Sequence, residues 1–283
     1  MPKGKLFKAL ARERANAAAI KKKEDAIKRQ QEVVKQKTLK NKRQQNQNKK
    51  PFIPFGPKDR LLLVGEGDFS YSCTILKKEY VSYEGSVICT GLDSREDVLQ
   101  KYPSTAPGNL DYLESCENAS VQFGVDATKL MSTKPFSKQR GSYNGIVFNF
   151  PHLGNSVSDQ ARNILQHQTL LLNFFDAAIP LLTAEGTIIV TLFESEPYIS
   201  WNIKKLAKSK GLKVVRSQGL EWASLPGYGH RLTAKEGHTN KEQATRPARI
   251  YVFGKSDPND TTAHASASKK RNGNDSDSDS DSD

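Results

Sequence analysis

The chain has 283 residues and a formal net charge of +12. No stretch approaches 18 consecutive apolar residues and the first 20 residues lack an apolar core, so we expect neither a membrane span nor a secretory signal. Cys73, Cys89 and Cys116 stand alone, without CxxC spacing. This argues against a disulfide framework or a zinc ribbon, and it indicates a reducing compartment.

The charge divides the chain into three parts. Residues 1–50 hold seventeen Lys and Arg against four Asp and Glu, and residues 255–283 hold four against seven. We expect the first part to be a disordered or solvated-helical basic arm, which can serve as a nuclear address, as an RNA-binding arm, or as both. We expect the last part to be a disordered Ser/Asp-rich tail, which is either a plain solvated acidic extension or a substrate of an acidophilic kinase. Residues 51–254 are long enough for one folded domain.

Short apolar runs alternate with helical patterns along this domain. The predicted strands are 61–64, 87–92, 121–123, 146–150, 186–193, 212–222 and 248–255. One helix should begin near Ser70 or Ser72, a second should run from an N-cap at Ser158 to Pro180, and a third should end at Gly211. Residues 224–247 show no helical pattern, so the last strand should pair antiparallel. The pattern predicts an α/β domain with a seven-stranded, mostly parallel sheet and helices on both faces, as in Rossmann-like class I methyltransferases.

The first strand runs into Gly65-Glu66-Gly67. In such sheets the ligand lies beyond the carboxyl ends of the strands, where glycine permits a tight turn and a close approach. Asp93 and Asp126 follow the second and third strands and can accept hydrogen bonds from a ribose and from an adenine amino group. Ser70 stands where a dinucleotide site has its third glycine, which favours S-adenosylmethionine over NAD or FAD. We therefore expect the cofactor loop to comprise Gly65, Glu66, Gly67, Asp68, Phe69 and Ser70.

Four segments carry a family resemblance. "LLLVGEGDFSYS", "NFPHLG", "EPYISWNIKKLAKSKGL" and "PGYGHRLT" occur in this order. Together they resemble the yeast-type 25S ribosomal RNA uridine-N3 methyltransferases, over roughly residues 58–254. The resemblance implies a class I fold, S-adenosylmethionine as cofactor, methylation of N3 of a uridine in large-subunit ribosomal RNA, and a nucleolar setting.

Two segments offer candidates for the chemistry. Asn149, Phe150 and His152 follow the fourth strand, where they could hold the base, stack on it and accept its proton. Asp68 is the alternative base, or it orients the cofactor. In "PGYGHRLT", Tyr228 can stack, His230 can donate a hydrogen bond and Arg231 can clamp a phosphate. Trp201 and His167 are interpreted as core residues.

Other functions remain open at this stage. The fold could belong to a non-catalytic ribosome-assembly factor that binds RNA, or to a methyltransferase acting on small molecules or proteins. The expected partner is large-subunit ribosomal RNA or a pre-ribosomal particle, in the nucleus and nucleolus. The histidines and cysteines show no metal-ligand spacing, so we expect no metal. The sequence leaves the oligomeric state open and is compatible with a monomer.

Overall fold

The computed structural model describes residues 51–154, 159–231 and 246–256. The predicted arm and nearly all of the predicted tail lie outside these residues, so their predicted disorder stays a prediction. The strands are β1 (Arg60–Val64), β2 (Ser86–Thr90), β3 (Ala119–Gln122), β4 (Tyr143–Asn149), β5 (Leu182–Phe193), β6 (Leu212–Gly219) and β7 (Ala248–Lys255). The α-helices are α2 (Ser70–Lys77), α3 (Arg95–Lys101), α4 (Ala106–Ser115), α5 (Gln160–Ala178) and α6 (Ile203–Ser209). Single 3₁₀ turns lie at Leu130–Ser132, Phe136–Lys138, Ile179–Leu181, Ile199–Trp201 and Trp222–Ser224.

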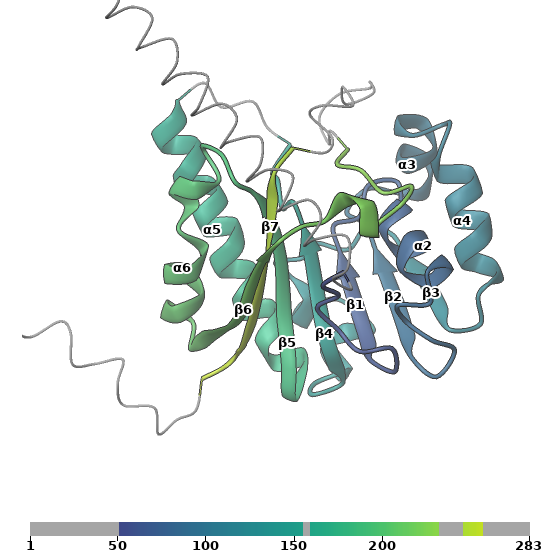
Figure 1. The fold of residues 1–283 in the computed structure, drawn as a ribbon, viewed down its shortest axis with the longest axis horizontal. Coiled ribbons are helices and arrows are strands. Elements are labelled where there is room, and N and C mark those ends of the chain that lie inside the picture. Colours follow the sequence, from purple (N-terminus) through teal and green to yellow (C-terminus); the bar gives the residue numbers. More distant parts are fainter. Residues whose placement is uncertain (1–50, 155–158, 232–245, 257–283) are drawn as a thin grey trace, which may run out of the picture. The chain divides into compact units, whose positions relative to one another are not determined.

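The strands form one sheet in the order β3-β2-β1-β4-β5-β7-β6 (Figure 1). β1 to β5 pair in parallel, with Leu63 opposite Cys89 on one side and Val147 on the other. β7 lies between β5 and β6 and is antiparallel to both. The predicted seven-stranded, mostly parallel sheet with an antiparallel last strand is confirmed.

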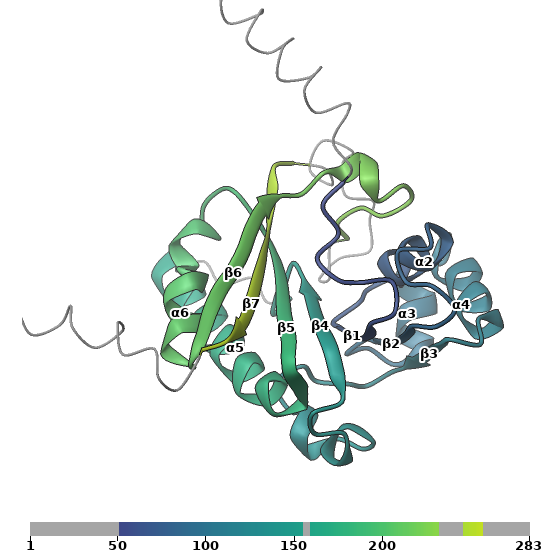
Figure 2. The ribbon, with the colours of Figure 1, turned by 60° about the horizontal axis from the view of Figure 1, so that its bottom comes forward.

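The strand residues point alternately to two hydrophobic cores. Leu62 and Val64 pack with α5 and α6, whereas Leu61 and Leu63 pack with α2, α3 and α4. The two groups of helices therefore cover opposite faces of the sheet, as Figures 1 and 2 show. Burial on both faces explains why the strands read as continuous apolar runs. The predicted helices on both faces are confirmed.

Several predicted boundaries were wrong. The second strand stops at Thr90, and Leu92 is 64% exposed. The fourth stops at Asn149, because Phe150 has a left-handed backbone with φ 50°. Asp159, not Ser158, caps α5 by accepting from the amides of Ala161 and Arg162; Ser158 lies outside the described residues. The predicted helix start at Ser70 and the helix end before Gly211, with φ +75°, are confirmed.

Helices α3 and α4, between β2 and β3, were absent from the prediction. Their signal is a capping pattern: the Ser94 hydroxyl accepts from the Asp97 amide at 3.1 Å, and Glu96 and Asp97 occupy the first turn of α3. Pro107 follows in the first turn of α4, where proline is tolerated. These helices place Tyr102, Thr105 and Asn109 beside the loop that follows β1. Among the described residues, no helix is long and apolar enough to span a membrane.

Candidate functional site

The loop between β1 and α2 is a tight turn that depends on glycine. Gly65 has φ +69°, and a Cβ there would overlap with the ring of Phe148. Phe69, the residue before α2, also has a left-handed backbone, with φ 60°. The chain thus reverses from strand to helix within five residues. The first glycine of the pattern serves this reversal, while Gly67 lies beneath the hydroxyl of Tyr102.

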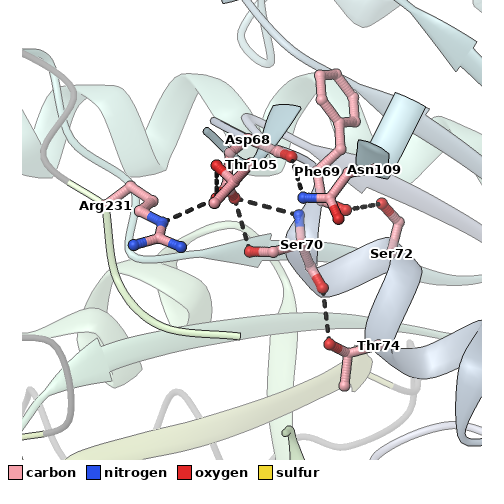
Figure 3. A network of polar contacts seen from close by, with 8 residues as sticks. All are labelled: Asp68, Phe69, Ser70, Ser72, Thr74, Thr105, Asn109 and Arg231. Carbon is pink, nitrogen blue, oxygen red and sulfur yellow. Dashed lines mark hydrogen bonds and ion pairs between the residues drawn. The ribbon is translucent and has the colours of Figure 1, made fainter. Parts of the chain in front are cut away.

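Asp68 is the centre of a hydrogen-bond network (Figure 3). Its Oδ1 accepts from the amide and hydroxyl of Ser70, at 3.2 and 2.6 Å. Its Oδ2 accepts from the Thr105 hydroxyl at 2.9 Å and from Arg231 Nε at 2.8 Å. The side chain is 3% exposed. Four donors occupy the four acceptor positions of a carboxylate, so the geometry favours Asp68 as an anchor rather than as a proton acceptor.

Glu66 places a second carboxyl group in the loop. Its Oε2 accepts from the Ser72 hydroxyl at 3.0 Å and from the Ser72 amide at 3.3 Å. Its buried Oε1 has no protein partner among the described residues. Burial, with a smaller contribution from the charge of Asp68, raises the pKa of Glu66 to about 8. The carboxyl is therefore mostly protonated at neutral pH and can donate a hydrogen bond.

A cleft, whose empty space of about 490 Å³ includes open solvent, brings the predicted segments together. Its walls are residues 65–71, Tyr102, Asn149, Phe150 and residues 228–231. The cofactor loop, the start of "NFPH" and the end of "PGYGHR" thus share one cavity although they are far apart in sequence. Sequence reasoning missed Tyr71 and Tyr102: Tyr71 belongs to the quoted segment "LLLVGEGDFSYS" but follows the glycine loop that was assigned to the cofactor, and Tyr102 belongs to no quoted segment. Buried Tyr71 receives a hydrogen bond from Asn149, and burial raises the pKa of its hydroxyl.

Asp93 and Asp126 lie just beyond β2 and β3, at the expected edge of the sheet, but neither lines the cleft. Asp93 forms an ion pair with Lys101 at 2.8 Å. Burial acts to raise the pKa of Asp126, but hydrogen bonds from Thr128 and Lys129 lower it overall. Both carboxylates follow strands that are neighbours in the sheet; their role as ribose and adenine ligands stays a prediction.

Asn149 and Phe150 enter the cleft from β4. The Thr191 hydroxyl donates to Asn149 Oδ1 at 2.6 Å, which fixes the orientation of the amide. Phe150 packs against Phe193, with ring centroids 4.4 Å apart, and is stacked parallel to Trp222 at 5.8 Å. Its ring is 7% exposed. The structure therefore gives Phe150 a packing role, and its predicted stacking on a base stays a prediction.

His152 lies outside the lining of the cleft. Its Nδ1 accepts from the Gly154 amide at 3.0 Å, so the neutral ring carries its proton on Nε2. Partial burial of the ring, and then the neighbouring His167, lower its pKa. His167 is fully buried and stacks on Trp201 at 4.4 Å, which confirms both as core residues. His167 also accepts from the Leu153 amide at 3.4 Å and so fixes the segment after His152.

The predicted RNA-binding residues fold over the cofactor loop. Tyr228 packs edge-on against Tyr71 at 5.1 Å, and Arg231 pairs with Asp68. His230 packs edge-on against Phe150 and Phe193. Burial, and then the charge of Arg246, lower the pKa of His230 to about 4, so the ring is neutral at physiological pH. No group of three or more His, Cys, Asp or Glu side chains within the described ranges could hold a metal ion.

Comparisons with known proteins agree with the motifs. The family model described as rRNA (uridine-N3-)-methyltransferase BTM5-like matches residues 62–232, more than half of the chain. The chain is 34% identical to the 25S rRNA (uridine(2634)-N(3))-methyltransferase of Saccharomyces cerevisiae, over 89% of this chain and 91% of that protein. It is 29% identical to a mouse protein named ferredoxin-fold anticodon-binding domain-containing protein 1 homolog, over 70% of this chain and 31% of that protein.

The solved structures that match are less similar to this chain in sequence. A 30S ribosomal A1408 methyltransferase from an uncultured bacterium aligns with 70% of this chain and 88% of its own, at 14% identity and a TM-score of 0.43. The family match is much stronger, and it spans the cofactor loop, Asn149 to His152 and the Tyr228–Arg231 segment. This chain, with its Rossmann-like class I sheet, belongs to the BMT5-like family of rRNA (uridine-N3-)-methyltransferases.

Proposed function

We propose that this protein is an S-adenosylmethionine-dependent methyltransferase that modifies N3 of a uridine in large-subunit (25S-type) ribosomal RNA. One observation carries the proposal: the family match runs through the three segments that line the cleft. The relative from Saccharomyces cerevisiae is named for this reaction. The nucleus, with its nucleolus, is the proposed place of action, on ribosomal RNA or a pre-ribosomal particle.

The chain's own groups fit the cofactor. Gly65, Glu66 and Gly67 line the cleft, and Glu66 Oε1 is a buried oxygen without a protein partner among the described residues. Asp93 and Asp126 offer carboxylates at adjacent strand ends. S-adenosylmethionine supplies an electrophilic methyl group on a sulfonium. The protein's contribution is to align the acceptor nitrogen and to exclude water.

The target nitrogen imposes two requirements. N3 of uracil lies on the Watson–Crick edge, so the base must be unpaired or flipped toward the cleft. We propose that Asn149 holds the uracil edge. The Asn149 amide has two acceptor positions and two N–H donors. Its contacts to Thr191 and Tyr71 use one of each, so one acceptor position and one donor remain for the base.

N3 also carries a proton that must leave. Of the two predicted acceptors, Asp68 has its acceptor positions occupied, whereas His152 is an exposed residue. We therefore propose His152 as the proton acceptor. To take the proton at Nδ1, its ring must release the Gly154 amide.

The direct test is the loss of one modified nucleoside. Mass spectrometry of large-subunit ribosomal RNA from cells lacking the gene should show less 3-methyluridine, restored by the intact protein. An Asn149→Ala variant should fail to restore it, whereas Asn144→Ala, on the same strand but away from the cleft, should succeed. Loss of 5-methyluridine or of a ribose-methylated nucleoside instead would refute the proposed reaction.

A further inference from the structure

Arg231 reaches the cleft because its loop is attached to the start of α2 at three points. The Thr74 hydroxyl donates to the Pro226 carbonyl at 3.1 Å, Tyr71 packs against Tyr228, and Asp68 binds Arg231. Two of these contacts come from residues of α2, and the third comes from the loop directly before it. They hold the loop in a defined position rather than leaving it free to follow an RNA strand.

Among the residues drawn in Figure 3, the ion pair leaves the two Nη groups of the guanidinium without a contact. Asp68 accepts from Nε, and the figure marks no bond from either Nη group to this carboxylate. The Nη pair carries four of the five N–H donors of an arginine and presents two of them in parallel. Such a fork matches the two oxygens of a carboxylate. Arg231 is the only Arg or Lys among the described residues that line the cleft.

We propose that Arg231 binds the α-carboxylate of S-adenosylmethionine and thereby joins the Pro226–Arg231 segment to the cofactor loop. The inference rests on the proposed function, since it assumes that cofactor. The α-carboxylate is the cofactor's anionic group. Asp68 then acts as a positioning residue, because it orients the guanidinium without touching the ligand.

An RNA phosphate is the competing ligand for Arg231. The side chain is only 27% exposed and is paired with an aspartate that is 3% exposed, within the cleft that contains the cofactor loop. A backbone phosphate would have to enter this cleft, whereas the amino-acid end of the cofactor is expected there. Burial and the Asp68 contact therefore favour the carboxylate.

Calorimetry on the full chain can separate the two. The probes are S-adenosylhomocysteine and its decarboxylated analogue, which keeps the adenosine, the sulfur and the amine. The wild type should bind S-adenosylhomocysteine about 10- to 150-fold more tightly, the usual effect of one charge-assisted contact. Arg231→Gln should abolish the preference for S-adenosylhomocysteine without lowering the affinity for the decarboxylated analogue. Arg231→Lys should retain part of the preference. Lys210→Gln is the control, because its cation pairs with Asp176 at the opposite edge of the sheet.

The outcomes are distinct. The assignment would be overturned if the preference survives in Arg231→Gln, or if this change lowers the affinity for both ligands equally. Weaker RNA binding with an intact preference would assign Arg231 to a phosphate instead. A wild type that binds both ligands equally refutes only the role of Arg231. If neither ligand binds the wild type, the proposed function fails as well.

Discussion

The turn after β1 predicts a large penalty for Gly65→Ala. A left-handed backbone with a Cβ costs about 1–2 kcal/mol. The new methyl group would also displace Phe148, which is 6% exposed and packs edge-on against Phe174 at 5.0 Å. Such overpacking costs about 1–3 kcal/mol. The free energy of unfolding should therefore fall by about 2–5 kcal/mol, a large share of the stability of an ordinary domain.

Gly108→Ala is the matched control. Gly108 lies in α4, is exposed, and would place its Cβ in open space. The same change there should raise the free energy of unfolding by about 0.5–1 kcal/mol, because alanine favours a helix. Urea unfolding of both variants measures the difference. A loss below about 1 kcal/mol for Gly65→Ala, with an unchanged dependence on urea, would show that the turn tolerates a side chain and refute the argument.

Four further predictions concern ligands and protons. Asp93→Ala should weaken the binding of S-adenosylhomocysteine by about 1.5–3 kcal/mol, as measured by calorimetry. Asp111→Ala, a change at an exposed residue of α4, should leave the affinity unchanged. Equal affinities of the two variants would remove Asp93 from the site. Because the folded pKa of Glu66 is about 8 against an ordinary 4.5, the folded state holds the proton more tightly, and stability is lost as pH rises between these values. Glu66→Gln should thus gain stability over the wild type from pH 5 to pH 8 in urea unfolding, and a constant difference would contradict the raised pKa. His152→Ala should slow single-turnover methyl transfer by about 10²–10⁴-fold. Because burial lowers the pKa of His152 below its ordinary 6.5, the wild-type rate should rise with pH on the acid side of that value and then level off, and a rise that persists in the variant would exclude His152. Deleting residues 1–50 should flatten the salt dependence of RNA binding, and an unchanged log–log slope would show that the arm is not a binder.

The sequence predicted the sheet well because its signals are local. The strand cores of β1, β4, β5 and β7 are apolar runs bounded by glycine, proline or charged residues, and each was found. The antiparallel last strand was expected because the sequence of residues 224–247 shows no helical pattern. The helix pair α3–α4 was missed although Ser94 and Asp97 form a capping pattern, because the apolar residues of both helices are few.

The candidate site was predictable as a set of segments but not as contacts. Motifs identified residues 65–70, 149–152 and 228–231, and one cleft joins most of them. The pairing of Asp68 with Arg231 links positions 163 residues apart, and no local pattern encodes such a contact. Thr105 and Asn109, which bind Asp68, come from the missed helix α4. His152 shows the opposite limit: the motif placed this histidine in the site, but it lies outside the lining of the cleft.

The insertion of β7 between β5 and β6 has an evolutionary consequence. β6 ends and β7 begins at the same end of the sheet, which is the end where the cleft lies. The connection between Gly219 and Ala248 therefore starts and finishes beside the cleft. Lengthening a connection costs only about 0.6 kcal/mol per doubling. We expect this connection to accept insertions and deletions during divergence outside Pro226–Arg231, which the contacts to Asp68, Tyr71 and Thr74 hold in place. Relatives could then acquire new RNA targets while the strand register and the cofactor loop stay unchanged.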